Sequence, residues 1–324
     1  IGTYAGTKAI GTNSVNVGHN AGYYATGSSN TFIGSEAGKG GTTSAPFSSG
    51  ENNVAVGYQA FDAFTTGYNN TIVGRSAGTA LTTGFGNVMI GRLAGYASTD
   101  VDKTVIIGEQ AAYTGNMTSD ADGTVSIGSG AGKNITSGQK NVAVGFGALT
   151  LEDDGDFNTA IGYQALTNQE GRSGTVNNTA VGQRAGASMT SGHDATLVGS
   201  NAGAAITTGM YNTIIGSNAA DALTTGDYNT AVGVHALSSE DVGRGTTAIG
   251  YQSLYSQNSD SNDEITGNTA VGYESGYALT TGISNTIIGY DAGKTLTTTS
   301  NNVIIGREAG NDTAGSNAVI IGSH

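Results

Sequence analysis

Acidic residues clustered in one short stretch are the best candidates for a metal site in this 324-residue chain. Asp260, Asp263 and Glu264 stand within five residues of one another, and Ca²⁺ prefers several such oxygen ligands. Similar acidic groups stand at 120–122 and 152–156. None has the spacing of an EF-hand or of a calcium-binding β-roll, so a solvated loop is the alternative interpretation. We expect weak calcium binding at Asp260, Asp263 and Glu264, and no other cofactor.

Groups suited to covalent or acid–base catalysis are scattered. The chain has no cysteine, and its histidines share no metal-binding spacing; they are His19, His193, His235 and His324. No Ser-His-Asp grouping is visible, so nucleophilic catalysis has no support in the sequence. The sequence predicts that the protein is not an enzyme. Carboxylates that pair across subunits to cleave a polysaccharide, as in a depolymerase tailspike, are an alternative.

Tyrosine recurs one residue after a repeated glycine. Exposed tyrosine rings stack on sugars or contact proteins, although they can also lie flat against the protein and stiffen it. We take five of them as candidates for surface recognition: Tyr58, Tyr163, Tyr251, Tyr273 and Tyr290.

A repeat positions all of these side chains. The recurring glycine, numbered 0 below, gives 19 copies, and 11 of the 18 steps between copies are 17 residues long. A fixed period of this kind is the signature of stacked coils. Two copies show the pattern well, and its structural residues are Asn158, Thr159, Ile161, Gly162 and Ala165, and Asn229, Thr230, Val232, Gly233 and Ala236.

The residues before the glycine predict a short β-strand. Position −1 is Ile or Val in all 19 copies, and position −3 is Val or Thr. Position −2 is Ala in some copies, such as Ala231, and Ile in others, such as Ile214. Because both faces are apolar, we expect a strand that is buried on both sides. The outer face of a single solenoid sheet is normally in contact with solvent. Because the outer face is apolar here, we expect another surface to cover it.

The residues after the glycine complete a coil. Position +3 is Ala in 16 copies, which predicts a tight corner. An apolar residue, two hydroxyl residues and a glycine then follow, as at 279–282, and we interpret them as a second strand ended by a turn. The fold predicted is an all-β parallel β-solenoid, or β-roll, of about 19 coils. At ~4.8 Å per coil it would form a rod of about 85 Å.

Asparagine stands at position −4 in 12 copies and predicts a ladder of amides along one corner. Insertions between the end of one coil and the next Asn fall at 38–53, 112–124, 166–178 and 254–268. Insertions in a solenoid usually project from one face and often bind. We expect residues 1–324 to form one continuous repeat domain and to be a fragment of a longer fibre with adjoining modules, because both ends fall inside a repeat.

Composition narrows the function classes. The formal charge of −13, with only 12 Lys and Arg, argues against nucleic-acid binding. No apolar run is long enough for a transmembrane helix, so we expect no membrane insertion.

The run Asn-Thr-Ala-Ile-Gly at 158–162, with the Ala and the Thr-Thr-Gly turn that follow such runs, resembles the head repeats of trimeric autotransporter adhesins of the YadA type. It is still more similar to repeats in predicted tail-fibre proteins of marine and cyanobacterial phages. The resemblance covers the whole chain and implies a left-handed β-roll, three copies of which pack around one axis. It also implies an extracellular location, on a virion tail fibre or a bacterial cell surface.

We therefore expect a homotrimeric fibre or adhesion segment that presents or contributes to binding of a cell-surface receptor, a glycan or a protein. The alternative is a monomeric β-solenoid with a threonine array of the ice-binding type, suggested by paired threonines at 65–66, 82–83, 207–208, 224–225, 280–281 and 297–298.

Overall fold

The protein is a parallel β-solenoid in a computed structural model, which describes residues 1–42, 44–170, 173–262, 264–311 and 315–323. The chain divides into two compact units. The first comprises Ile1–Asn158 and Arg172–Thr175, and the second comprises Thr159–Gly171 and Val176–His324. Both units are built from the same coil.

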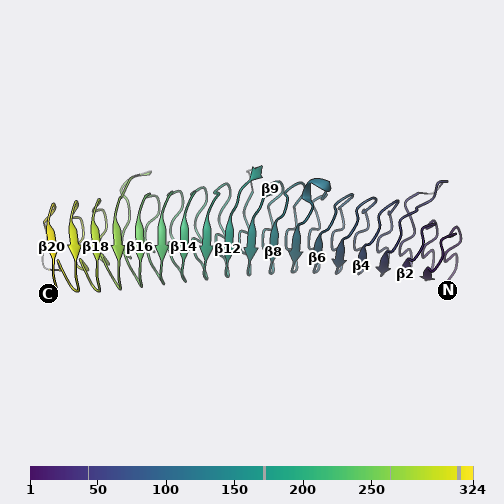
Figure 1. The fold of residues 1–324 in the computed structure, drawn as a ribbon, viewed down its shortest axis with the longest axis horizontal. Helices are drawn as coiled ribbons and strands as arrows, with labels where there is room; N and C mark the ends of the chain where they lie inside the picture. Colours follow the sequence, from purple (N-terminus) through teal and green to yellow (C-terminus); the bar gives the residue numbers. More distant parts are fainter. Residues whose placement is uncertain (43, 171–172, 263, 312–314, 324) are drawn as a thin grey trace. The chain divides into compact units, whose positions relative to one another are not determined.

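Each unit is a stack of three-residue parallel strands (Figure 1). The first unit contains β1 (Val15–Val17), β2 (Thr31–Ile33), β3 (Val54–Val56), β4 (Thr71–Val73), β5 (Val88–Ile90), β6 (Val105–Ile107), β7 (Val125–Ile127) and β8 (Val142–Val144). The second contains β10 (Thr159–Ile161), β12 (Thr179–Val181), β13 (Thr196–Val198), β14 (Thr213–Ile215), β15 (Thr230–Val232), β16 (Thr247–Ile249), β17 (Thr269–Val271), β18 (Thr286–Ile288), β19 (Val303–Ile305) and β20 (Val319–Ile321). The remaining elements lie in or beside the insertions of the first unit: η1 (Ser119–Ala121), β9 (Gly155–Asp156) and β11 (Gly174–Thr175).

The predicted all-β parallel solenoid with coils of mainly 17 residues is confirmed. Equivalent residues pair in every step within a unit, as in Thr213 with Thr230 and Ile215 with Val232. Among the described residues the repeat contributes 18 strands, because the copy at Gly2 forms none.

The prediction of a second strand in each coil is wrong. The Thr-Thr segments form bends rather than a ladder. Single backbone bonds tie them to the next coil, as from the Thr207 N–H to the Thr224 carbonyl at 2.8 Å. The residues between each strand and its Thr-Thr segment form turns. The side of each coil opposite its strand therefore has no continuous β-ladder. Within the described residues, each coil therefore adds one three-residue strand to the main sheet, and β9 and β11 form a separate two-stranded sheet.

The glycine at position 0 ends each strand. Gly233 has φ of 138°, a conformation that side chains with a Cβ avoid. A Cβ placed there would lie 2.3 Å from the carbonyl oxygen of Gly250 in the next coil. Stacked glycine backbones in successive coils therefore touch, and no other residue type fits.

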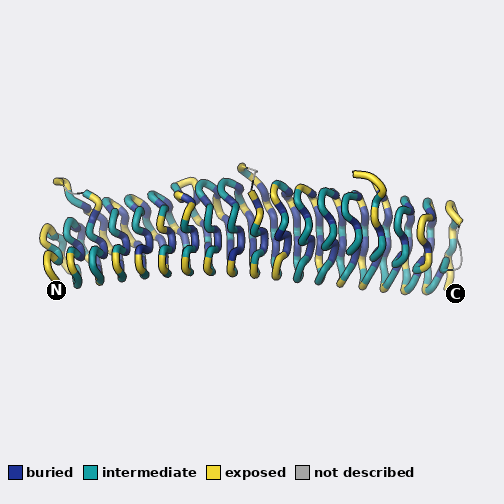
Figure 2. Tube along the Cα trace, turned by 180° about the vertical axis from the view of Figure 1, so that it is seen from behind, coloured by how far each residue is buried: buried dark blue, intermediate teal, exposed yellow. Residues whose placement is uncertain are grey.

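The interior of each coil is narrow and apolar. Position −2 points inward and is fully buried, as at Ile214 and Ala231, together with the corner alanine, as at Ala236. Position +7 completes the core, as at Leu223. Figure 2 shows these buried residues running through the middle of the coils, with exposed residues at the turns. The expected tight corner at position +3 is confirmed.

The asparagine ladder is also confirmed. The Asn70 amide Nδ2 donates to the carbonyl of Gly84 at 2.8 Å, and its Oδ1 accepts from the backbone N–H of Asn87 at 2.9 Å. Where the position is threonine the ladder continues, because the Thr104 hydroxyl donates to Oδ1 of Asn87 at 2.7 Å. These buried amides satisfy the backbone groups of the turn, so they are structural.

Polar residues replace the core leucine at position +7 in some coils. Glu152, Gln169, Glu240 and Gln257 stand there, and all are buried. Each of these coils has Leu at position +4, where many others have Gly. The leucine fills the core instead. Leu254 packs against Gly276 of the next coil, so closely that a Cβ added to Gly276 would lie 2.8 Å from Leu254 Cδ2. Position +7 is then free to be polar and to bond to the turn.

Candidate functional site

The outer face of the strands is the main unpartnered apolar surface of the described chain. The β-branched residues at −3 and −1 point away from the core and are half-buried or exposed in every strand. At position −1, six isoleucines are 37–40% exposed: Ile33, Ile90, Ile161, Ile215, Ile249 and Ile288. The expectation that the strand is buried on both sides is therefore wrong for a single chain. Within one chain, only the strand face that carries position −2 packs against the core.

The outer face differs in chemistry between the two units. In the first unit, six of the eight strands carry Val at position −3. In the second unit, β10 and β12–β18 all carry Thr there, and the pairing holds these eight threonines in register. A row of Thr at position −3 and a row of Val or Ile at position −1 therefore run side by side along this unit.

Three of the candidate tyrosines form a stacked ladder. The ring centroids of Tyr251 and Tyr273 are 5.1 Å apart, and those of Tyr273 and Tyr290 are 5.0 Å apart, with planes within 16°. The Arg307 guanidinium lies over the Tyr290 ring at 5.7 Å. The ring faces that meet within the ladder are therefore occupied by neighbouring rings and a cation. A stiffening role describes this ladder better than stacking on a sugar does.

The other two candidate tyrosines lie in other coils. Tyr58 and Tyr163 are 46% and 47% exposed, as open as the ladder residues. Tyr58 follows the glycine after β3, and Tyr163 follows the glycine after β10. The structure therefore does not bring the five predicted tyrosines together into one site.

The predicted calcium site is described only in part. Asp260 is exposed, and its backbone N–H donates to Oε2 of Glu264 at 3.1 Å. Asp263 lies outside the described residues. The Glu264 carboxylate therefore caps its own loop, and calcium binding here stays a prediction.

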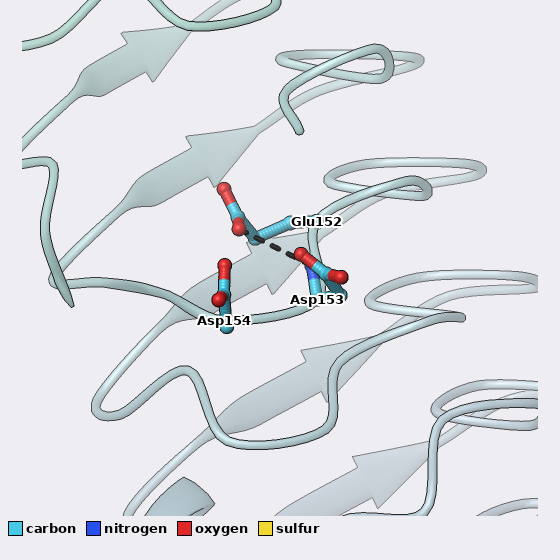
Figure 3. Close-up of side chains that lie close together, drawn as sticks. All are labelled: Glu152, Asp153 and Asp154. Carbon is cyan, nitrogen blue, oxygen red and sulfur yellow. Dashed lines mark hydrogen bonds between the residues drawn. The ribbon is translucent and has the colours of Figure 1, made fainter. Parts of the chain in front are cut away.

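A different acidic group is the one metal-sized cluster found among the described residues. Glu152, Asp153 and Asp154 offer carboxylate oxygens within 4.8 Å of one another (Figure 3). Glu152 is fully buried, and its Oε1 accepts the backbone N–H groups of Gly155 at 2.7 Å and Asp153 at 3.2 Å. Its Oε2 accepts Nδ2 of Asn158 at 3.4 Å. Both oxygens are thus engaged by donors that would compete with a cation.

Burial raises the pKa of Glu152 to about 7. The bond from the Gly155 N–H opposes this shift, and the neighbouring Asp153 carboxylate adds to it. The pKa of Asp154 is also raised, first by burial and then by Asp153. Glu152 therefore titrates near neutral pH, which its sequence context does not predict.

The histidines take separate places. His193 is buried, its Nδ1 lies 2.8 Å from Oδ2 of Asp194, and its ring packs edge-on against Tyr211. His19 is exposed in the first coils, and His235 is half-buried. His324 lies outside the described residues. His193 thus has a packing role that its position in the sequence does not reveal.

Comparison with models of known protein families gives no match, and comparison with curated protein sequences gives no significant match. Within the described ranges, no helix is long or apolar enough to cross a membrane. The function must therefore be argued from the surfaces of the solenoid.

Proposed function

We propose that this chain is a structural and adhesive segment of a homotrimeric fibre, in which three copies pack the outer faces of their strands around one axis. The observation that carries the proposal is the unpartnered row of Ile and Val at position −1. Large contiguous apolar surface on a soluble protein marks a contact with another molecule. The repeated geometry of this row fits a second and third copy of the same surface.

Burial of this row would contribute a driving force for association. Fully burying an Ile or Val side chain stabilises by roughly 1.5–3 kcal/mol, so covering the exposed two-fifths of Ile249 contributes about 1 kcal/mol. The second unit alone repeats this position in β10 and β12–β19. The row therefore offers on the order of 5 kcal/mol or more per chain, before the cost of losing translational freedom.

In this proposal the β-roll is left-handed, as the resemblance to adhesin heads implies, and adjoining modules continue the fibre. The location is extracellular, on a virion tail fibre or a bacterial surface. The partners are two further copies of the chain and a cell-surface receptor, a glycan or a protein. The low content of charged residues, 11%, suits a long surface built from Asn, Thr, Ser and Gly.

A second candidate function is supported by the threonine row of the second unit. Eight outward threonines in register, spaced by the strand separation of ~4.8 Å, form a flat hydroxyl array suited to ice. The Thr-Thr turns, whose paired threonines also suggest this role, are less suited. Their first hydroxyl is engaged, as where Thr224 Oγ1 donates to the Asp241 carbonyl at 2.8 Å. Thermal hysteresis of the purified protein would support this function. It requires the outer strand face to be exposed to solvent rather than covered by other copies of the chain.

Sedimentation of the native protein separates the two candidates. The fibre proposal predicts a particle of three times 32.2 kDa, and Ile249→Lys in the outer row should shift it towards the monomer. Each trimer would then bury three ammonium groups without partners, which is strongly unfavourable. The matched control is Ile265→Lys, at an isoleucine of the same unit that is 64% exposed but lies in the insertion. It should leave the mass unchanged. A wild-type particle of 32 kDa would refute the trimer and favour the lone solenoid.

A further inference from the structure

The first coils of the first unit carry an aromatic cluster that differs from the tyrosine ladder. Tyr4 packs edge-on against Tyr23, with ring centroids 6.2 Å apart and planes at 73°. Tyr23 and Tyr24 pack in the same way at 4.5 Å and 75°. Rings at such angles form walls, whereas rings stacked in parallel cover one another. The cluster therefore leaves aromatic surface available where the ladder does not.

These walls line an open pocket of about 270 Å³. Its lining combines the aromatic rings with three polar side chains, and consists of Tyr4, His19, Asn20, Tyr23, Tyr24 and Lys39. Ligand pockets commonly measure roughly 300–1,000 Å³, so this one suits an occupant of about one sugar ring. Aromatic side chains and a small number of polar groups are both common in small-molecule sites.

The pocket is fixed by three consecutive coils. The Asn20 N–H donates to the Thr3 carbonyl at 3.0 Å, and the Tyr24 N–H donates to the Lys39 carbonyl at 2.7 Å. The first insertion supports the wall from behind, since Phe47 stacks on Tyr24 at 5.7 Å and 25°. A site held by backbone bonds between coils is ordered before a ligand arrives, which lowers the entropic cost of binding.

The charges at the pocket favour a neutral ligand. The Lys39 ammonium lies 3.7 Å from Oδ1 of Asp62, an ion pair in which both side chains are partly exposed. This carboxylate offsets the positive charge, while the three ammonium protons still allow Lys39 to donate to a hydroxyl. A nucleotide would need clustered positive charge for its phosphates, and a chain with a formal charge of −13 disfavours it.

We propose that this pocket binds one neutral pyranose residue of a surface glycan. The rings of Tyr4 and Tyr23 contact the C–H face of the sugar, and His19, Asn20 and Lys39 hydrogen-bond to its hydroxyls. The inference rests on the proposed function in taking a glycan as the receptor, and it places the glycan contact in the first coils rather than at the repeated tyrosines.

Saturation-transfer NMR with methyl pyranosides tests the proposal. The probes are the methyl glycosides of glucose, galactose, mannose, N-acetylglucosamine and N-acetylgalactosamine, each at about 10 mM because single sugars bind with Kd on the order of mM. Methyl glucuronide and methyl sialoside serve as anionic comparators. We expect at least one neutral pyranoside to bind the full chain. Binding of none of them, or of the anionic sugars alone, overturns the proposal.

Two variants and a control locate the site. Tyr23→Ala should weaken binding by about tenfold or more, and Lys39→Met should weaken it without disturbing the aromatic packing. The matched control is Tyr255→Ala, at a half-buried tyrosine in the equivalent position of a coil in the second unit, stacked on Tyr277. Retained affinity in both Tyr23→Ala and Lys39→Met overturns the proposal, as does equal loss in Tyr255→Ala.

Sedimentation of the same samples keeps the two proposals distinct. A trimer that binds no neutral sugar overturns the pocket and leaves the fibre intact. A monomer whose sugar binding depends on Tyr23 and Lys39 supports the pocket and refutes the fibre.

Discussion

Glu152→Gln tests the claim that a buried carboxyl makes the stability of the first unit depend on pH. Glu152 is fully buried at a core position, and burial raises its pKa from 4.5 to about 7. The chain itself shows that glutamine is tolerated at this position, because Gln169 and Gln257 are its equivalents in other coils. The substitution therefore removes the titration with little change in shape.

The sign follows from the direction of the shift. A carboxyl with a raised pKa in the folded state binds its proton more tightly there than in the unfolded chain. Its contribution to stability is fully present below pH 4.5, and it is lost as the pH rises through about 7. One pKa unit corresponds to about 1.4 kcal/mol, so the change from 4.5 to about 7 corresponds to about 3 kcal/mol.

Amide hydrogen exchange read by mass spectrometry measures this locally, which suits a stacked repeat in which opening need not be global. The peptide 145–160 should lose about 3 kcal/mol of protection between about pH 5 and about pH 8, after correction for intrinsic exchange. Glu152→Gln should remove most of that loss. A peptide from 250–262 in the second unit is the internal control and should not respond to the substitution. Equal pH dependence of peptide 145–160 in both proteins would refute the reasoning.

Three further predictions concern the coil and its loops. Gly233→Ala should destabilise the second unit by about 3 kcal/mol, because the new Cβ would meet the Gly250 carbonyl; a thermal melt within ~1 kcal/mol of wild type would contradict this. Asn229→Ala should cost about 3 kcal/mol in denaturant unfolding, since the Gly243 carbonyl and a backbone N–H of the next coil lose their partner. An unchanged unfolding midpoint would show that water replaces the amide. Excess calcium should raise the melting temperature of the protein slightly through the loop 254–268, and identical melting in EDTA and in calcium would remove that site.

Much of the coil could be predicted from residue types and spacing alone. Glycine at position 0, alanine at +3 and asparagine at −4 each satisfy a local requirement of backbone conformation, space or hydrogen bonding. Such requirements recur in every copy, so the sequence displays them directly, as at Asn229 and Gly233. The second strand was predicted wrongly because its apolar and hydroxyl residues have strand propensity, whereas the turns around them prevent a ladder.

The candidate sites could be predicted less well from the sequence. Tyr251, Tyr273 and Tyr290 have suitable residue types, but only the stacking of successive coils shows that their ring faces are covered. Tyr4 and Tyr23 stand in different coils, and their edge-on packing depends on the register between those coils. A signal was present in the adjacent tyrosines Tyr23 and Tyr24 beside the first insertion, but a pair of residues does not define a pocket.

The sequence by itself determined the repeat, the strand in each coil and the asparagine ladder, because each follows from local backbone chemistry. Only the tertiary structure decided which apolar face of the strand is the core. Alternation places positions −1 and −3 on one face and −2 on the other, and both faces are apolar here. The narrow interior, already filled by residues such as Ala236 and Leu223, takes position −2. The Ile and Val row is thereby left outside, and the raised pKa of Glu152 likewise follows from burial that only packing creates.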